Sequence, residues 1–288
     1  MVLVKELVAT NDKVRKEIKE LEMICQEHDK LKGNVFLDTS LNYNPDIKSL
    51  FLLYVDDKLV SFLSLFIPMS QEAEVSAYTL PKYRKLGYFT QLLAHAKEEL
   101  NKYNISGLVF VCESQSEAGV ETIRKLKGEY EFTEYYLRYR RPVEEDYIQQ
   151  VNITLRRAEH GDLEALIGLS QDIFLDAYED AKSLIAKTLE AENRIQYIAT
   201  ISDLPIGMIS VGFEQGEASI FGFGVSPQYQ GKGYGKVILR LILKELVNMD
   251  IEIITLEVDS NNQRAYNFYR NYGFEVETSY DYYRKNLQ

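Results

Sequence analysis

The chain carries one sequence pattern twice, 146 residues apart (Pro81 to Pro227), and this repeat limits the fold more than any other feature. The two segments are 78–89 and 224–235. In both, a proline, a tyrosine, a long polar residue, a glycine and a second tyrosine follow one another at the same spacing. A repeat of this kind predicts the same supersecondary unit twice. The length of 288 residues allows two units of ~100–200 residues each.

After each segment, apolar residues recur every three or four positions, which is typical of a helix with one buried face. They are Leu92, Leu93, Ala96 and Leu100 in the first copy and Val237, Ile238, Leu241, Ile242 and Leu246 in the second. Short apolar runs at 108–112 and 251–258 follow these helices and predict buried strands.

Before each segment the pattern predicts helices, a hairpin and a third strand. The predicted helices are 12–27, 162–174 and 180–190. The hairpins are 51–55 with 59–67 and 195–201 with 206–213, and the third strands are 74–79 and 218–225. Hairpins give antiparallel pairs, and a strand–helix–strand crossover gives a parallel pair.

A proline and a cluster of acidic residues at 141–146 separate the two copies. We therefore predict an α/β protein of two tandem domains, 1–141 and 150–288. Each domain is expected to contain a mixed, mostly antiparallel central sheet flanked by helices.

Composition argues against nucleic-acid and membrane binding. The formal net charge is −11, whereas a protein that neutralises phosphates needs a basic surface. The longest apolar stretch, 59–69, is interrupted by Ser61 and Ser64 and is shorter than the ~18 residues of a membrane span. The N-terminal residues show no signal-peptide pattern. An acidic surface suits cationic small molecules or amines.

The cysteine and histidine content predicts neither disulfides nor a metal site. Cys25 and Cys112 are too few for a disulfide framework, and we expect them to be buried thiols in a reducing cytoplasm. His28, His95 and His160 are far apart and form no His-Glu-x-x-His motif.

The second segment ends in a glycine-rich loop between a predicted strand and a predicted helix. Glycine lets the backbone approach a ligand closely, and the first amides of a helix attract anions, phosphate above all. Lys232 and Lys236 could add positive charge there. The spacing fits neither a nucleotide P-loop nor the dinucleotide fingerprint, and a tight turn without a ligand is the alternative.

The loop and the sequence after it resemble the GNAT superfamily of N-acetyltransferases. Gln230-x-x-Gly233-x-Gly235 is similar to the acetyl-coenzyme A (acetyl-CoA) signature of that family. The resemblance continues through Leu256-Glu257-Val258 and Asn262-x-x-Ala265-x-x-Phe268-Tyr269-x-x-x-Gly273-Phe274. It covers the C-terminal half clearly and the N-terminal half more distantly, so the chain looks like a tandem GNAT protein.

The resemblance implies which residues hold the cofactor. The strand before the loop would be splayed from its neighbour by a bulge, and its backbone at Phe223, Gly224 and Val225 would pair with the pantetheine arm. The pyrophosphate would lie on the loop, and Asn262 would contact the cofactor from the next helix. The loop residues are Gln230, Gly231, Lys232, Gly233, Tyr234, Gly235 and Lys236.

The resemblance also implies the catalytic groups. Tyr269 matches a tyrosine that often protonates the departing thiolate, and Glu257 matches a glutamate used as base by members that acetylate protein N-termini. The alternatives are a tyrosine that only packs in the core and a solvated glutamate, with a water path removing the proton.

The first copy departs from the family pattern, so we expect domain 1–141 to be non-catalytic. Phe89 replaces Gly235. Aligning Gly128 with Gly273 places Arg124 at the Tyr269 position, Cys112 at the Glu257 position and Glu117 at the Asn262 position. Arg84 and Gly87 could still hold a phosphate. The tyrosines at the end of the chain are expected to form a closing strand that lends one or two residues to the acceptor pocket; they are Tyr280, Tyr282 and Tyr283.

Together these features predict a cytoplasmic, acetyl-CoA-dependent N-acetyltransferase without a metal. The catalytic domain would be 150–288, and the acceptor a primary amine of a small molecule or peptide that attacks the thioester directly. Two alternatives stay open at this point: a non-catalytic acyl-CoA-binding or scaffolding protein, and an acetyltransferase of protein N-termini.

Overall fold

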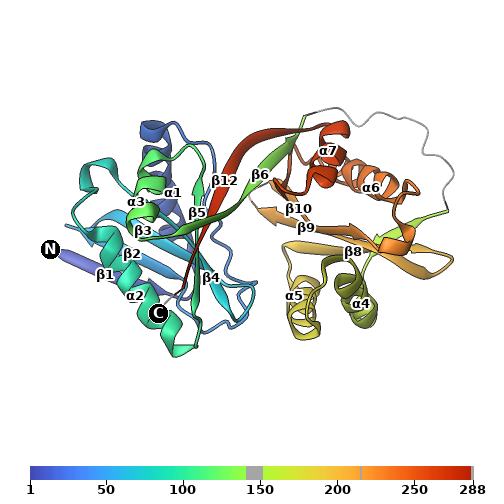
Figure 1. Cartoon of the computed structure of the whole chain (residues 1–288), viewed down its shortest axis with the longest axis horizontal. Helices are drawn as coiled ribbons and strands as arrows, with labels where there is room; N and C mark the ends of the chain where they lie inside the picture. The colour runs from blue at the N-terminus through green and yellow to red at the C-terminus, as the bar shows by residue number, and fades with distance from the viewer. Residues whose placement is uncertain (141–151, 215, 287–288) are drawn as a thin grey trace. The chain divides into compact units, whose positions relative to one another are not determined.

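The computed structural model describes residues 1–140, 152–214 and 216–286 (Figure 1). The predicted boundary at 141–146 lies outside these residues. The described chain is an α/β protein, as the sequence predicts.

Helices and 3₁₀ turns lie at these positions in the described chain: α1 (Asp12–Asp29), η1 (Pro81–Tyr83), α2 (Tyr88–Lys102), α3 (Glu117–Lys125), η2 (His160–Asp162), α4 (Leu163–Phe174), α5 (Tyr178–Glu190), η3 (Pro227–Tyr229), α6 (Tyr234–Asn248) and α7 (Gln263–Asn271). The strands are β1 (Val2–Leu7), β2 (Leu50–Val55), β3 (Lys58–Phe66), β4 (Glu72–Thr79), β5 (Gly107–Glu113), β6 (Glu129–Tyr139), β7 (Thr154–Arg157), β8 (Arg194–Ile201), β9 (Leu204–Glu214), β10 (Glu217–Val225), β11 (Ile253–Asp259) and β12 (Phe274–Asn286).

The chain forms two compact units. The first consists of Met1–Tyr135, Asp259–Asn261 and the end of the chain from Glu277, and the second of Tyr136–Val258 and Asn262–Val276. The predicted domains 1–141 and 150–288 are continuous stretches of the chain, whereas each compact unit consists of separate stretches. The predicted limits describe the two copies of the repeat and stay a prediction. The compact units, in addition, exchange strands.

The first unit is built on a sheet in the order β1-β2-β3-β4-β5-β12. Its pairs are antiparallel except for the parallel pair β4–β5, which follows from the α2 crossover between those strands. Helices α1 and α2 cover opposite faces of this sheet (Figure 1). Strands β2 and β3 are therefore buried on both faces, with Leu52 and Leu63 wholly inaccessible.

The second unit repeats this plan in the order β11-β10-β9-β8-β7. Strands β10 and β11 are parallel, and the pairs from β10 to β7 are antiparallel. Helices α4 and α5 lie on one face of the sheet, and α6 and α7 on the other (Figure 1). In each copy, the antiparallel strands are followed in the sheet by one parallel pair. The repeated segment connects the first strand of that pair to a helix.

The last strand of the chain completes the sheet of the first unit. Residues Tyr280–Asn286 of β12 pair antiparallel with Gly107–Glu113 of β5. The ring of Tyr282 stacks on Phe132 at 4.4 Å, and its hydroxyl donates a hydrogen bond of 2.7 Å to Glu134. The tyrosine-rich tail is the closing strand that the sequence predicts, but these residues belong to the first unit and not to the second.

The second unit is closed by the end of β6, which neighbours β11. The amide of Arg140 donates a 2.9 Å hydrogen bond to the carbonyl of Gly273. The strand that follows the first copy in sequence therefore finishes the second unit, and the strand that follows the second copy finishes the first.

Removing the Tyr282 side chain should destabilise the first unit although the residue stands near the end of the chain. Tyr282→Ala deletes a buried ring and removes the hydroxyl that donates a hydrogen bond to Glu134. We therefore expect the free energy of unfolding to fall by ~3 kcal/mol or more. Hydrogen exchange followed by mass spectrometry should show that the variant exchanges faster than the wild type in β5, with a smaller increase in β8 and β9. Val276→Ala, at a residue 40% exposed on the same strand, is the matched control. Faster exchange confined to β8 and β9 would contradict the assignment of this strand.

Candidate active site

The glycine loop of the second unit exposes backbone amides at the start of α6. Gly231 and Gly233 have φ angles of 76° and 83°, in the left-handed region that favours glycine. Gly233 is the N-cap of α6 and provides no side-chain cap. The first amides of this helix therefore have no intrahelical acceptor and are available to an anion.

The first unit contains the same loop backbone. Lys85 and Gly87, at the positions of Gly231 and Gly233, have φ angles of 62° and 84°, and Gly87 is again an N-cap without a side-chain bond. The strand before each loop ends in the same 3₁₀ turn, η1 or η3. The repeat found in the sequence is thus a repeat of backbone geometry, including a left-handed lysine in place of one glycine.

One side chain anchors each loop to the strand before it. Gln230 Nε2 donates a 2.9 Å hydrogen bond to the carbonyl of Val225, and Arg84 Nε donates one of 3.1 Å to the carbonyl of Thr79. The remaining bonds of the two side chains differ. Gln230 Oε1 accepts a 3.0 Å bond from Arg264, whereas Arg84 forms a two-pronged ion pair with Asp29.

The parallel pair β10–β11 is short. It ends at Ile220 and Leu256, and the two strands then part. Against β9, the register of β10 shifts between Phe221 and Gly224, so two residues of β10 oppose one of β9. This bulge, which the family resemblance implies, is present. It leaves backbone groups of β10 from Gly222 to Val225 without a partner strand on the β11 side.

Close packing explains the glycine at 224 in this bulge. A Cβ atom there would lie 2.3 Å from Cγ2 of Ile173 and 3.2 Å from the ring of Phe174, both in α4. Gly222 has a φ of 54° and supplies the left-handed turn of the bulge. In the first unit the register between β3 and β4 is continuous, with Ser76 and Tyr78 on the corresponding strand.

Tyr269 lies in α7 against the bulged strand. Its ring centroid is 6.4 Å from Phe223 and 5.9 Å from Phe274. Burial among these rings raises the pKa of the Tyr269 hydroxyl to about 12, because it disfavours the phenolate. The hydroxyl therefore keeps its proton over the whole neutral range.

Glu257 lies at the point where β10 and β11 part. It is the first residue of β11 beyond the last pair, and it is exposed between the buried Leu256 and Val258. Asn262 caps α7, with its Oδ1 accepting a 3.0 Å hydrogen bond from the amide of Ala265. Asn262, the predicted cofactor contact, is therefore also the N-cap of the helix that carries Tyr269.

Four cationic side chains lie in the second loop or on the helices beside it, and the sequence predicts two of them, Lys232 and Lys236. Lys232 lies 5.3 Å from the ring centre of Tyr229, and Lys236 and Arg240 lie 5.6 and 5.9 Å from that of Tyr272. Arg264 reaches Gln230, as described above. Arg240 stands four residues after Lys236 on α6, so helical spacing could have revealed it.

The predicted alignment of the first copy needs a correction. The helix and strand bounds place β5 and α3 at the same offset of 146 from β11 and α7 as the loops (107 to 253, 117 to 263). Lys127, with a φ of 62°, is the counterpart of Gly273, with a φ of 96°, and Gly128 follows it. Glycine is the usual residue at such a left-handed position, but here Lys127 occupies it and Gly128 comes one residue later.

At the corrected offset, the counterparts of the three site residues are not Arg124, Cys112 and Glu117. They are Ile123 for Tyr269, Val111 for Glu257 and Ser116 for Asn262. Ser116 caps α3 through its hydroxyl, as Asn262 caps α7. The conclusion that the first copy has neither the tyrosine nor the glutamate is unchanged.

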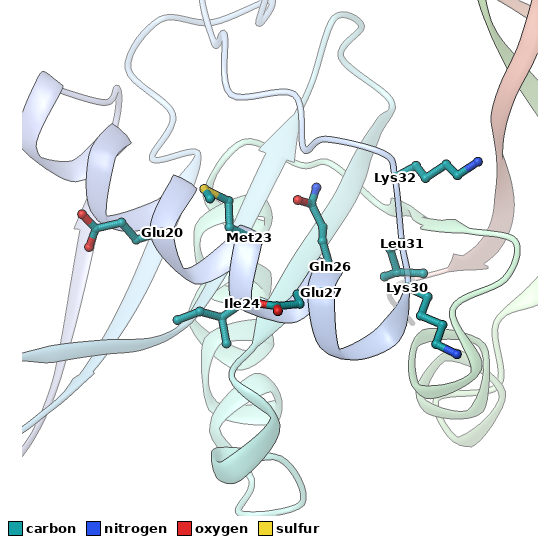
Figure 2. Close-up of a pocket in the computed structure, with 8 residues that line it drawn as sticks. All are labelled: Glu20, Met23, Ile24, Gln26, Glu27, Lys30, Leu31 and Lys32. Carbon is teal, nitrogen blue, oxygen red and sulfur yellow. The ribbon is translucent and has the colours of Figure 1, made fainter.

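Two hollows lie in the first unit. A cleft of about 520 Å³ opens between the ends of β4 and β5 beside the first loop. A shallower hollow of about 790 Å³ runs along the end of α1, where Figure 2 shows the side chains spreading apart rather than converging. In the part of the chain that the structure describes, no three His, Cys, Asp or Glu residues gather as metal ligands, and no helix is long and apolar enough to cross a membrane.

Comparison with known proteins finds one family in both halves. The model of the acetyltransferase (GNAT) family matches residues 15–126 and 163–274. Over 60 residues the chain is 42% identical to a histone acetyltransferase TAP1 of Glycine max, covering 21% of this chain and 25% of that protein. Over 70 residues it is 34% identical to the [ribosomal protein bS18]-alanine N-acetyltransferase of Haemophilus influenzae, covering 24% and 47%. The matches thus span less than half of either relative.

Solved structures share the fold over the whole chain. A tandem GNAT protein from the clavulanic acid biosynthesis pathway has a TM-score of 0.76 at 14% identity, covering 100% of this chain and 99% of that one. A GCN5-related N-acetyltransferase from Sphaerobacter thermophilus has a TM-score of 0.74 at 17% identity, covering 100% and 96%. At these identities the likeness concerns the fold alone.

Proposed function

The chain belongs to the acetyltransferase (GNAT) family and is an acyltransferase, and we propose that its second copy transfers an acetyl group from acetyl-CoA to a primary amine. The observation that carries the proposal is the parting of β10 from β11 next to a loop of uncapped amides. Members of this family generally use acetyl-CoA.

The loop and its cations suit the pyrophosphate and phosphate groups of the cofactor. The amides at the start of α6 present partial positive charge, and the four cationic side chains add to it. The backbone of β10 from Phe223 to Val225, which has no partner strand on the β11 side, would bind the pantetheine arm as a neighbouring strand does. Binding of this kind brings the thioester to the fork between the two strands.

The protein must assist the transfer in three ways. The acceptor amine must lose a proton, the carbonyl oxygen must be stabilised as charge develops on it, and the thiolate must be protonated as it leaves. In this proposal, backbone amides of the bulged strand stabilise the carbonyl oxygen, and the Tyr269 hydroxyl protonates the departing thiolate. Glu257, exposed at the fork, would accept the amine proton directly or through water.

A second candidate acceptor is the N-terminus of a protein. The similarity to the bS18-alanine N-acetyltransferase of Haemophilus influenzae favours it, as does the position of Glu257 at the fork. Turnover of acetyl-CoA with a panel of amines and a panel of N-terminal peptides separates this acceptor from small molecules. Absence of turnover with both panels, together with acetyl-CoA binding, would support a non-catalytic acyl-CoA-binding role.

We also propose that the protein works in the cytoplasm. Both cysteines are free thiols in the structure, which suits a reducing compartment. Fractionation of cells that produce the protein tests this location.

A negative charge in the loop should weaken acetyl-CoA binding. Gly233→Asp places a carboxylate beside the amides that would hold the pyrophosphate, and no atom beyond the two neighbouring residues lies within 4 Å of the new Cβ. We expect the dissociation constant, measured by calorimetry, to rise at least about tenfold, about 1.4 kcal/mol. Gly216→Asp is the matched control, since Gly216 has a φ of 85° and equally open surroundings outside the loop. Equal effects of the two variants would remove the loop from the binding site.

Loss of the Tyr269 hydroxyl should slow turnover and spare binding. In Tyr269→Phe we expect kcat to fall ~10²–10⁴-fold with little change in acetyl-CoA affinity. Because the pKa of Tyr269 is raised to about 12, its neutral form persists and the wild-type rate should not fall through its ionisation as pH rises from 7 to 10. Tyr266→Phe, on the same helix, is the control. Undiminished turnover in Tyr269→Phe would leave Tyr269 as a packing residue.

Removal of the Glu257 charge should slow turnover less than removal of the Tyr269 hydroxyl, and chiefly at low pH. In Glu257→Gln the amine must lose its proton without the carboxylate, so the loss of rate should exceed that of a nearby exposed change such as Glu252→Gln. The deficit should shrink as the pH approaches the pKa of the acceptor, because more of the amine is then neutral. A deficit that is constant over pH would assign the proton to another route.

A further inference from the structure

The proposed reaction does not use the cleft of the first unit. Every residue that lines this cleft belongs to that unit, and its volume of about 520 Å³ lies within the ~300–1,000 Å³ typical of small-molecule sites. The cleft exists because β4 and β5 are paired only as far as Val75 and Phe110 and then part. Helices α2 and α3 contribute the rest of its wall.

One end of the cleft is a place for a negative charge. Lys85, Gly87 and the first residues of α2 line it, and the backbone there repeats the loop of the second unit. The N-cap Gly87 makes no side-chain bond, so the first amides of this 15-residue helix are available to a ligand.

The surroundings of this loop lack the charges that a nucleotide needs. The four cations around the second loop are replaced, 146 residues earlier, by Leu86, Thr90, Ala94 and Ala118. Arg84 is held by Asp29, and Lys125 by Glu121 at 2.6 Å. The charged residues of the cleft are three carboxylates and three cations, so they sum to zero: Asp29, Glu113 and Glu121 against Arg84, Lys85 and Lys125.

The deepest of these carboxylates is satisfied by the protein. Glu113 accepts hydrogen bonds from the amides of Lys32 and Gly33 and from the hydroxyl of Thr278, at 2.7 to 3.0 Å. It therefore needs no cation from a ligand. The attraction for an anion comes from the helix amides and Lys85, in a cleft whose charged side chains sum to zero, which suits one negative charge rather than several.

The remaining wall is apolar and aromatic. Val75, Phe110, Ile123 and Leu126 line it, and Tyr78 stands at the position that Gly224 occupies in the second unit. Tyr78 adds an aromatic side chain to this wall, whereas Ile173 fills the space beside Gly224 in the second unit, and the hydrocarbon side chain of Ile123 stands at the position of Tyr269. The wall thus suits a short apolar body instead of a long polar arm.

We propose that the cleft of the first unit binds an organic monocarboxylate with a compact apolar or aromatic body. The carboxylate would lie on the amides at the start of α2, and the apolar body between the parted ends of β4 and β5. This site is separate from acetyl transfer by the second unit, and its test does not depend on activity.

The test uses the full chain with isotope-labelled isoleucine methyl groups and 3-phenylpropanoate as the probe. With acetyl-CoA present at saturation, the probe should shift the Ile123 methyl resonance with a dissociation constant of ~1 mM or tighter. The uncharged 3-phenylpropan-1-ol should bind at least about tenfold more weakly, because it gains nothing from the helix amides. Gly87→Asp should weaken binding of the carboxylate by at least about tenfold, whereas Gly216→Asp should not.

Three results would overturn the proposal. One is a calorimetric stoichiometry of two acetyl-CoA per chain, with the second equivalent displacing the probe from Ile123. Another is equal affinity for the alcohol and the carboxylate. The third is binding of the carboxylate that Gly87→Asp leaves unchanged, with the Ile123 and neighbouring resonances showing an intact fold.

Discussion

The parting of two parallel strands is the constraint on which the candidate site depends. In each unit the parallel pair consists of four residue pairs, after which the strands separate and one of them turns into a loop and a helix. Backbone groups that would otherwise bond to a neighbouring strand are left for a ligand. A longer pair would close the fork and bury the amides at the start of the helix, so the short pairing is itself the source of the binding geometry.

Most of the site could be predicted from the sequence because its signals are local. The proline, tyrosines and glycines of the repeat fix a loop within twelve residues, and Gly222 and Gly224 mark a bulge. The exchange of strands could not be predicted, since β5 and β11 offer similar apolar edges and nothing local states which edge the last strand joins. The predicted alignment of the first copy is displaced by one residue for a similar reason. Tertiary structure holds Lys127 in the left-handed conformation that glycine usually adopts at this position.

The two loops show how one backbone can support different chemistry. Their dihedral angles agree closely, and an equivalent side chain ties each to the preceding strand. Around the second loop stand four cations and a half-buried tyrosine, and around the first stand apolar and small side chains with balanced charges. The amides attract an anion in both units, and the side chains decide how much negative charge, and how large a body, the site would accept.

The exchanged strand has a consequence for the synthesis of the protein. Asn286 pairs with Gly107, and the strand holding it is made 173 residues after β5 ends at Glu113 (286 − 113). At 5–20 residues per second, the apolar edge of β5 waits roughly 10–35 s for its partner while the rest of the chain leaves the ribosome. During that interval the nascent first unit presents an open strand edge, so a chaperone or the ribosome surface would have to shield it. Conversely, the first unit cannot be completed by a truncated translation product, whose exposed edge would mark it for degradation.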